Sequence, residues 1–164
     1  MRKKILKTIP FVLAAAGLAA LLPGPAWAAS GTQPASGTFR DTSITIDSSS
    51  TADGNTIGLL TVSGFTTGTF AATFTETDQV VLHPDGTVTL AGKGMISGAL
   101  GTCGTGSAPY EIEARGTLSA RSGFLQSIDQ AASTVTPMNI SSVVYFTVNG
   151  VTNEGTYTGT YHCT

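Results

Sequence analysis

Hydrophobic and polar side chains alternate most regularly between residues 68 and 100, in two runs that flank the tetrapeptide HPDG at residues 83–86. Alternation with a period of two is typical of half-buried β-strands. In HPDG, proline fits the second turn position and glycine fits the last, where a left-handed residue is needed. The pattern therefore predicts a β-hairpin with a bulged three-residue loop, in which His83 lies opposite Thr87. In this register one face of the hairpin is apolar and the other is rich in threonine.

Two carboxylates interrupt the apolar face of this hairpin. The predicted register places Glu76 opposite Gly94 and Asp78 opposite Gly92, so each acid faces a residue that leaves space for it. If both acids point inward, they raise each other's pKa and can serve as acid and base. A bulge near Asp78, or a position at the mouth of a barrel, would instead leave them in water, which avoids the cost of an unpaired buried charge.

Weaker alternation predicts further strands along the chain. Ile44 and Ile46 define a first strand, and Ile57, Leu59 and Phe65 share one side of a second. The expected elements outside the central hairpin are strands over residues 39–47, 56–65, 108–121 and 124–131, a polar loop over residues 48–55, and a second hairpin over residues 139–163.

The strand predicted over residues 108–121 has an apolar and a charged face. Tyr110 lies on the apolar face, whereas Arg115 and Arg121 fall on the outward face. We therefore expect no basic residue from this strand beside Glu76 and Asp78.

A second turn, Asn149-Gly150, is a strong signal for a two-residue hairpin loop. It places Val148 opposite Val151 and again separates a threonine-rich face from an apolar one. The apolar face holds Met138, Ile140, Val144, Phe146, Val148, Val151, Gly155, Tyr157, Gly159, Tyr161 and Cys163.

These elements predict an all-β fold. No stretch after residue 28 has a helical period, and eight strands joined by short turns are most simply closed into an antiparallel up-and-down barrel. Glycines at positions 92, 94, 98, 155 and 159 suit the strong coiling that closure requires. A β-sandwich is the alternative architecture.

The first 28 residues are expected to be a secretory signal peptide. A basic patch precedes an apolar run over residues 9–22, and Ala26-Trp27-Ala28 is typical of a cleavage site. The run of 14 residues is short for a membrane anchor, which needs about 20. Cleavage after Ala28 exposes Ala29 rather than a cysteine, so we expect release outside the cell or into the cell wall without a lipid anchor. Residues 29–37 are then a flexible leader, and residues 38–164 a single barrel domain.

Charge and cysteines narrow the function classes. After cleavage four basic residues remain against ten acidic ones, a net charge of −6, which argues against nucleic acid as a partner. Cys103 and Cys163 are the two cysteines, and an exported protein meets an oxidising environment, so we expect them to form a disulfide. A reactive thiol is the alternative, but no histidine or helix lies near Cys103 in the sequence to lower its pKa.

Several turn and glycine motifs resemble a known family. ASGTF at residues 35–39, GFTTGT at residues 64–69, HPDGT at residues 83–87 and GTYHC at residues 159–163 are similar to small exported bacterial proteins related to the allene oxide cyclase β-barrel. The resemblance is strongest in the first half of the mature chain, and it implies the barrel. No catalytic residue of a cyclase is carried over to a position in this sequence.

The candidate site is the barrel lumen. Neither histidine belongs to a cluster with metal-ligand spacing, so we expect no metal, and no motif calls for a cofactor. The catalytic candidates are Glu76 and Asp78, and the lumen residues expected to contact a ligand are Phe70, Phe74, Glu76, Asp78, Tyr110, Phe146, Tyr157 and Tyr161.

The favoured function is an exported, non-enzymatic module that binds a small apolar molecule or serves as an extracellular structural unit. Eight-stranded barrels have interiors little larger than their own side chains, which favours this reading. The alternative is a cyclase-type or isomerase-type enzyme that uses the inward carboxylates, with Tyr110 or Tyr157 assisting. The sequence identifies neither the ligand nor the oligomeric state.

Overall fold

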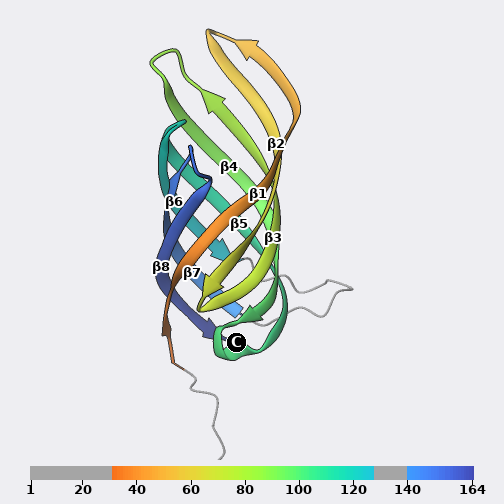
Figure 1. Cartoon of the computed structure of the whole chain (residues 1–164), viewed down its shortest axis with the longest axis vertical. Coiled ribbons are helices and arrows are strands. Elements are labelled where there is room, and N and C mark those ends of the chain that lie inside the picture. The colour runs from red at the N-terminus through yellow and green to blue at the C-terminus, as the bar shows by residue number, and fades with distance from the viewer. Residues whose placement is uncertain (1–30, 128–139) are drawn as a thin grey trace, which may run out of the picture.

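The structure, a computed structural model, describes residues 31–127 and 140–164, and within them the chain forms a closed antiparallel barrel (Figure 1). Its eight strands follow one another around the barrel in sequence order. The predicted fold class is confirmed. The strands are β1 (Gln33–Ala52), β2 (Asn55–Gly68), β3 (Phe70–Leu82), β4 (Thr87–Leu100), β5 (Thr105–Thr117), β6 (Ala120–Ser127), β7 (Ile140–Asn149) and β8 (Glu154–Cys163), with a 3₁₀ turn η1 (Gly101–Cys103) between β4 and β5.

The central hairpin, β3 and β4, has the register that the sequence predicts. Leu82 pairs with Val88, and the ladder continues without a shift to Phe70 and Leu100. The loop closes through a hydrogen bond from the His83 N–H to the Thr87 carbonyl, and Gly86 takes the left-handed conformation with φ 82°. Side chains at even positions of β3 therefore face the lumen, and the threonines at odd positions face solvent.

β1 is longer than the sequence predicts at both ends. Gln33 to Gly37 pair with β8, so these residues are strand and the prediction of a leader through residue 37 was wrong for them. The predicted polar loop over residues 48–55 was also wrong, because β1 continues to Ala52 and turns tightly through Asp53 and Gly54. The expected signal peptide lies outside the described residues.

Two bulges interrupt β1, one between Asp41 and Ser43 and the other between Ile46 and Ser48. Pairing of β1 with β8 ends at Arg40, and from there β1 runs on beside β2. In the described chain, no other strand pairs with this upper part of β1. The β1–β2 hairpin therefore projects past the end of β8, as Figure 1 shows at the top of the barrel.

The β7–β8 turn differs from the predicted two-residue loop. The predicted register places Val148 opposite Val151. In the structure Val148 pairs with Gly155 and Asn149 pairs with Glu154. The Asn149 side-chain oxygen accepts hydrogen bonds from the N–H groups of Val151 and Thr152, which closes a longer loop. The true register differs from the predicted one by an even number of residues, so the inward and outward faces are unchanged. Val151 itself is 78% exposed in the loop, where an inward position was predicted.

The boundaries of β5 and β6 also differ from the prediction. β5 ends at Thr117 and β6 starts at Ala120, so Arg121 begins a new strand instead of ending the old one. Residues 128–131 of the predicted sixth strand lie outside the described residues. In β2, Leu59 and Phe65 are each 40% exposed and face outward, while the lumen side of that strand carries Leu60 and Val62.

One end of the barrel is plugged by its own side chains. Phe70 begins β3, Leu100 ends β4, and Tyr157 and Tyr161 lie on the last strand, and all four are buried in one hydrophobic cluster. The Phe70 ring stacks on Tyr157 at 5.7 Å and meets Tyr161 edge-on at 5.5 Å between ring centroids.

Within the described ranges no helix is long and apolar enough to cross a membrane.

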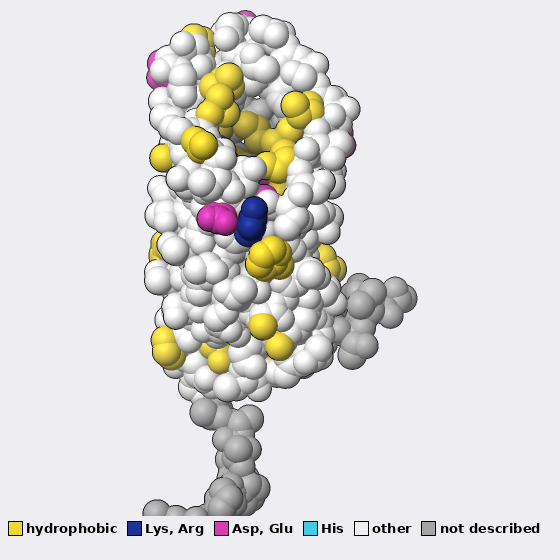
Figure 2. All heavy atoms as spheres, in the orientation of Figure 1, with side chains coloured by type: hydrophobic (Ala, Val, Ile, Leu, Met, Phe, Trp, Pro, Cys, Tyr) yellow, Lys and Arg dark blue, Asp and Glu magenta, His cyan; other side chains and the backbone are white. Residues whose placement is uncertain are grey.

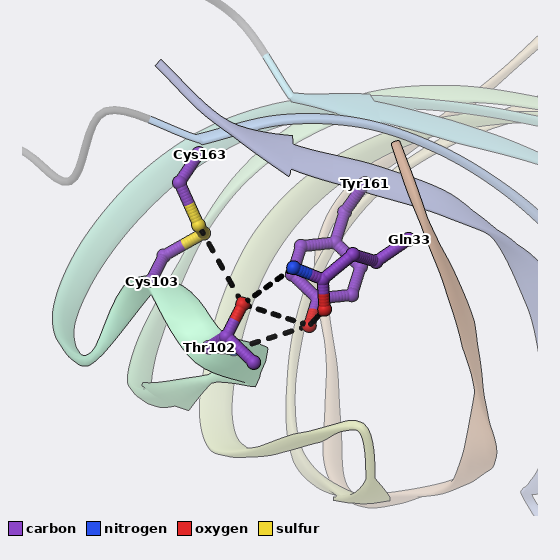
Figure 3. Close-up of a disulfide and its surroundings, with 5 residues drawn as sticks. All are labelled: Gln33, Thr102, Cys103, Tyr161 and Cys163. Atoms are coloured by element: carbon purple, nitrogen blue, oxygen red, sulfur yellow. Dashed lines mark hydrogen bonds between the residues drawn. A yellow bond between two sulfur atoms is a disulfide. The ribbon is translucent and has the colours of Figure 1, made fainter. Parts of the chain in front are cut away.

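The predicted disulfide between Cys103 and Cys163 is present at this plugged end and ties η1 to the last strand (Figure 3). Beside it the Tyr161 hydroxyl accepts a hydrogen bond from the Thr102 N–H at 3.1 Å and donates one to Gln33 Oε1 at 3.0 Å. The beginning of β1, the middle loop and the C-terminus are therefore held together at one point.

Candidate functional site

The lumen contains a cavity of about 370 Å³. Figure 2 shows it as a hollow in the upper part of the molecule, with hydrophobic side chains inside. The mouth side carries mainly aliphatic residues, and the region toward the plugged end carries aromatic ones. The side chains that line it are mostly apolar and include Phe39, Ile44, Leu60, Val62, Phe70, Phe74, Val80, Val88, Leu90, Ile96, Leu118, Leu125, Phe146, Val148 and Tyr157.

Both predicted acids lie inside the barrel. Glu76 is 8% exposed and Asp78 is 1% exposed, and both line the cavity from β3. Their cross-strand partners on β4 are Gly94 and Gly92, as the sequence predicts. A Cβ atom on Gly94 would lie 2.8 Å from the Glu76 Cβ, and one on Gly92 would collide with Asp78 Oδ1. The two glycines therefore make the space that the carboxyl groups occupy.

Tyr110 connects this pair to β5, because it lies beside Gly94 on the far side from Glu76. Its ring projects from β5, is 2% exposed, and its hydroxyl donates a hydrogen bond of 2.6 Å to Glu76 Oε2. Asp78 lies two residues from Glu76 on the same face of β3 and lines the same cavity. Tyrosine, glutamic acid and aspartate thus form one group of polar side chains within apolar walls.

Burial sets the protonation of these groups. Loss of water, and then the nearby Asp78 charge, raise the pKa of Glu76 from 4.5 to about 8. Burial, and then the Asp41 charge, raise the pKa of Asp78 from 3.8 to about 6. Burial also raises the pKa of Tyr110. At neutral pH Glu76 therefore keeps its proton while Asp78 is largely ionised.

Two further charged groups join the site, and sequence reasoning missed both. Asp41 on β1 lines the cavity, and burial raises its pKa to about 6 against the lowering effect of Arg121. Arg121 on β6 also lines the cavity, so its predicted outward position was wrong. Its Nη1 donates a hydrogen bond of 2.8 Å to the Leu118 carbonyl. Arg115, by contrast, is exposed as predicted.

A usable signal existed for each missed residue. Asp41 shares its parity with Phe39, which lines the cavity, but the bulge after Asp41 shifts the parity of Ile44 and Ile46, the two residues that define the predicted strand. Arg121 alternates with Gly123 and Leu125, a pattern that becomes visible once the turn at residues 118–119 is recognised.

The remaining predicted lumen residues divide into two groups. Phe70, Phe74, Phe146 and Tyr157 line the cavity. Tyr161 does not line it, because its ring fills the plugged end and its hydroxyl is bonded near the disulfide. The Tyr157 hydroxyl is likewise committed to structure, since it donates to the Thr67 carbonyl and accepts from the Phe70 N–H, each at 2.9 Å.

Across residues 31–127 and 140–164, no group of three or more histidine, cysteine or acidic side chains is placed to hold a metal ion. Comparison of the chain with protein-family models and with curated proteins finds no match.

Proposed function

We propose that the protein is an exported, non-enzymatic barrel that binds a small, mainly apolar molecule in its lumen. The observation that carries this proposal is the cavity of about 370 Å³, lined mostly by apolar side chains and plugged at one end. Its volume falls within the range of about 300–1,000 Å³ that is common for small-molecule sites. A barrel that served only as a structural unit would gain stability by filling this space with side chains.

Export is the second part of the proposal. It is supported by the basic and apolar leader at residues 1–28 and by the Cys103–Cys163 disulfide, because disulfides persist mainly in oxidising compartments. The measurement is the N-terminal sequence of protein recovered from the medium of expressing bacteria. A start at Ala29 supports export, whereas intact leader retained in the cells contradicts it.

Lumen binding is tested with Nile red, a neutral dye whose emission rises in apolar surroundings. We expect saturable binding of one dye to the protein that starts at Ala29. Leu90 lines the cavity, whereas Leu59 is 40% exposed on the outer face, so the chain offers a matched pair. Leu90→Trp fills the lumen and should weaken binding by about tenfold or more, a cost of about 1.4 kcal/mol. Leu59→Trp should bind as the parent does. Equal affinity in the two variants, or no saturable binding, overturns the proposal.

One observation favours a second candidate, an isomerase-type or cyclase-type enzyme. Glu76 and Asp78 lie in one apolar cavity with pKa values of about 8 and about 6, the arrangement expected of a general acid and a general base. In an allylic isomerisation Asp78 would take a proton from carbon and a proton would return two carbons away, with no change in oxidation state.

A simple probe for this second candidate is 3-cyclohexenone, whose conversion to the conjugated 2-cyclohexenone is followed by ultraviolet absorbance. An enzyme should show a bell-shaped rate profile between about pH 6 and pH 8 and should lose it in Asp78→Asn. A rate that is the same in the parent and in Asp78→Asn removes support for proton transfer by this pair.

A further inference from the structure

One carboxylate oxygen in the cavity lacks a hydrogen-bond partner. Asp78 Oδ1 is fully buried, and within the described chain no donor reaches it. Asp78 itself is 1% exposed and lines the cavity. A buried acceptor without a partner is costly, because it has lost water and gained nothing in return. The Oδ1 atom itself lies against Gly92, so a bound molecule meets the Asp78 carboxylate where the side chain lines the cavity, and a donor there would offset part of this cost.

The charges around this oxygen are unbalanced. Asp41, Glu76 and Asp78 line the cavity, and Arg121 is the one basic side chain among the residues described as lining it. Arg121 Nη1 already donates a hydrogen bond to the Leu118 carbonyl. With Glu76 protonated at neutral pH, two carboxylates face one guanidinium. One further positive charge would neutralise the cavity.

The apolar walls on either side determine what can carry that charge. Val80, Val88 and Leu90 lie toward the mouth, and Phe74 and Ile96 lie toward the plugged end, so the acids occupy the middle of an otherwise apolar space. A bare metal ion would find no group of three acidic, histidine or cysteine ligands placed for it in the described chain. A molecule with one cationic group on an apolar body would neutralise the excess negative charge and would pack against the apolar walls.

We propose that the lumen ligand is an apolar amine whose protonated nitrogen donates to the Asp78 carboxylate while its hydrocarbon body packs against the cavity walls. This inference rests on the proposed lumen binding and adds the chemical class of the ligand. Hydrogen bonds between charged groups in low dielectric are the strongest available to such a ligand, which favours an amine over an alcohol of the same shape.

Three matched molecules test the inference: octylamine, 1-octanol and octanoic acid, each used below its critical micelle concentration to displace Nile red. At pH 7 we expect octylamine to displace the dye at a concentration lower than 1-octanol by about tenfold or more, and octanoic acid to be the weakest. Asp78→Asn keeps the size of the side chain and should remove the preference for the amine, measured as the ratio of the octylamine and 1-octanol displacement concentrations within that variant. Glu113→Gln, on the exposed outer face of β5, should keep that preference.

The parent protein also gives a readout that needs no variant. Lowering the pH from 7 to 5 protonates Asp41 and Asp78, whose pKa values are both about 6, while the alkylamine stays charged. Glu76 and Tyr110 already hold their protons at pH 7, and Arg121 is the basic side chain that lines the cavity with these acids. The advantage of octylamine over 1-octanol should therefore shrink at pH 5.

The outcomes separate the two proposals. Dye binding with equal displacement by octylamine and 1-octanol at pH 7 overturns the amine inference and leaves lumen binding standing. Dye binding with an amine preference that persists in Asp78→Asn and at pH 5 also overturns the inference, because the preference then comes from another site. Absence of saturable dye binding removes lumen binding itself.

Discussion

The buried carboxyl of Glu76 should contribute to a pH dependence of the stability of the barrel, and Glu76→Gln should remove that contribution. Burial raises the pKa of Glu76 from 4.5 to about 8, so between these values the folded state holds a proton that the unfolded chain has lost. The contribution of this group to stability is therefore complete below the unfolded pKa and is lost as the pH rises through about 8.

The size of the effect follows from the pKa values. One pKa unit corresponds to about 1.4 kcal/mol, so the interval from 4.5 to pH 7 amounts to about 3 kcal/mol of lost stability for the acid. Glutamine has the shape of the protonated acid, and its amide can accept from Tyr110 and donate to Asp78. The variant should thus match the parent near pH 4 and exceed it by about 3 kcal/mol at pH 7.

The assay is urea unfolding at pH 4 and at pH 7, followed by circular dichroism because Trp27 precedes the expected cleavage site and leaves no tryptophan in the mature chain. Glu113→Gln makes the same chemical change on the outer face and serves as the control. The reasoning is refuted if the difference in unfolding free energy between Glu76→Gln and the parent is the same at the two pH values. Destabilisation by Glu76→Gln at pH 7 would also contradict it.

Three further predictions concern the barrel. Replacing Cys103 and Cys163 by serine should lower the free energy of unfolding by roughly 4 kcal/mol, as expected for a sequence separation of 60 residues, and equal urea midpoints with and without reductant would contradict this. Gly94→Ala should cost about 1–3 kcal/mol, because its Cβ would lie 2.5 Å from a buried tyrosine ring, whereas Gly58→Ala, whose nearest neighbour is 3.8 Å away, should cost less in the same urea assay. Tyr157→Phe should cost about 1–3 kcal/mol by leaving backbone groups at the plugged end unpaired, and thermal melting at an unchanged temperature would argue against it.

The inward position of Glu76 and Asp78 could be predicted because a single loop determines it. Residues 83–86 allow one hairpin geometry, and the period of two then places every side chain of β3 and β4 without further assumptions. The glycines opposite the acids belong to the same ladder, so the space for the carboxyl groups was predictable too.

The turns at the other hairpins were harder to predict because a dipeptide signal is local. Asn149-Gly150 favours a two-residue loop, yet the Asn149 side chain accepts two backbone N–H groups and stabilises a longer one. A tight two-residue turn occurs at Asp53-Gly54, between β1 and β2, with φ values of 52° and 78°. It was overlooked because the serines and threonines that flank it lack alternation, and no face of β1 is buried there.

Asp41 and Arg121 were missed because the alternation of inward and outward side chains shifts wherever a strand contains a bulge or ends in a turn. One extra residue in β1 exchanges inward and outward positions beyond the bulge, and one unrecognised turn does the same between β5 and β6. The sequence therefore predicted two of the three acids described in the cavity and misplaced Arg121, the cation that lines it with them.

The bulges in β1 have a consequence for the behaviour of the protein at high concentration. The upper part of β1 is a sheet edge, and a straight edge is a template on which a second copy can add a strand and start a fibre. Two bulges within a few residues break the regular spacing of backbone donors and acceptors, and Asp47 adds a charge beside the second. The strand that stands beside the mouth of the cavity is thereby protected against polymerisation, so the barrel can keep an open rim without covering it.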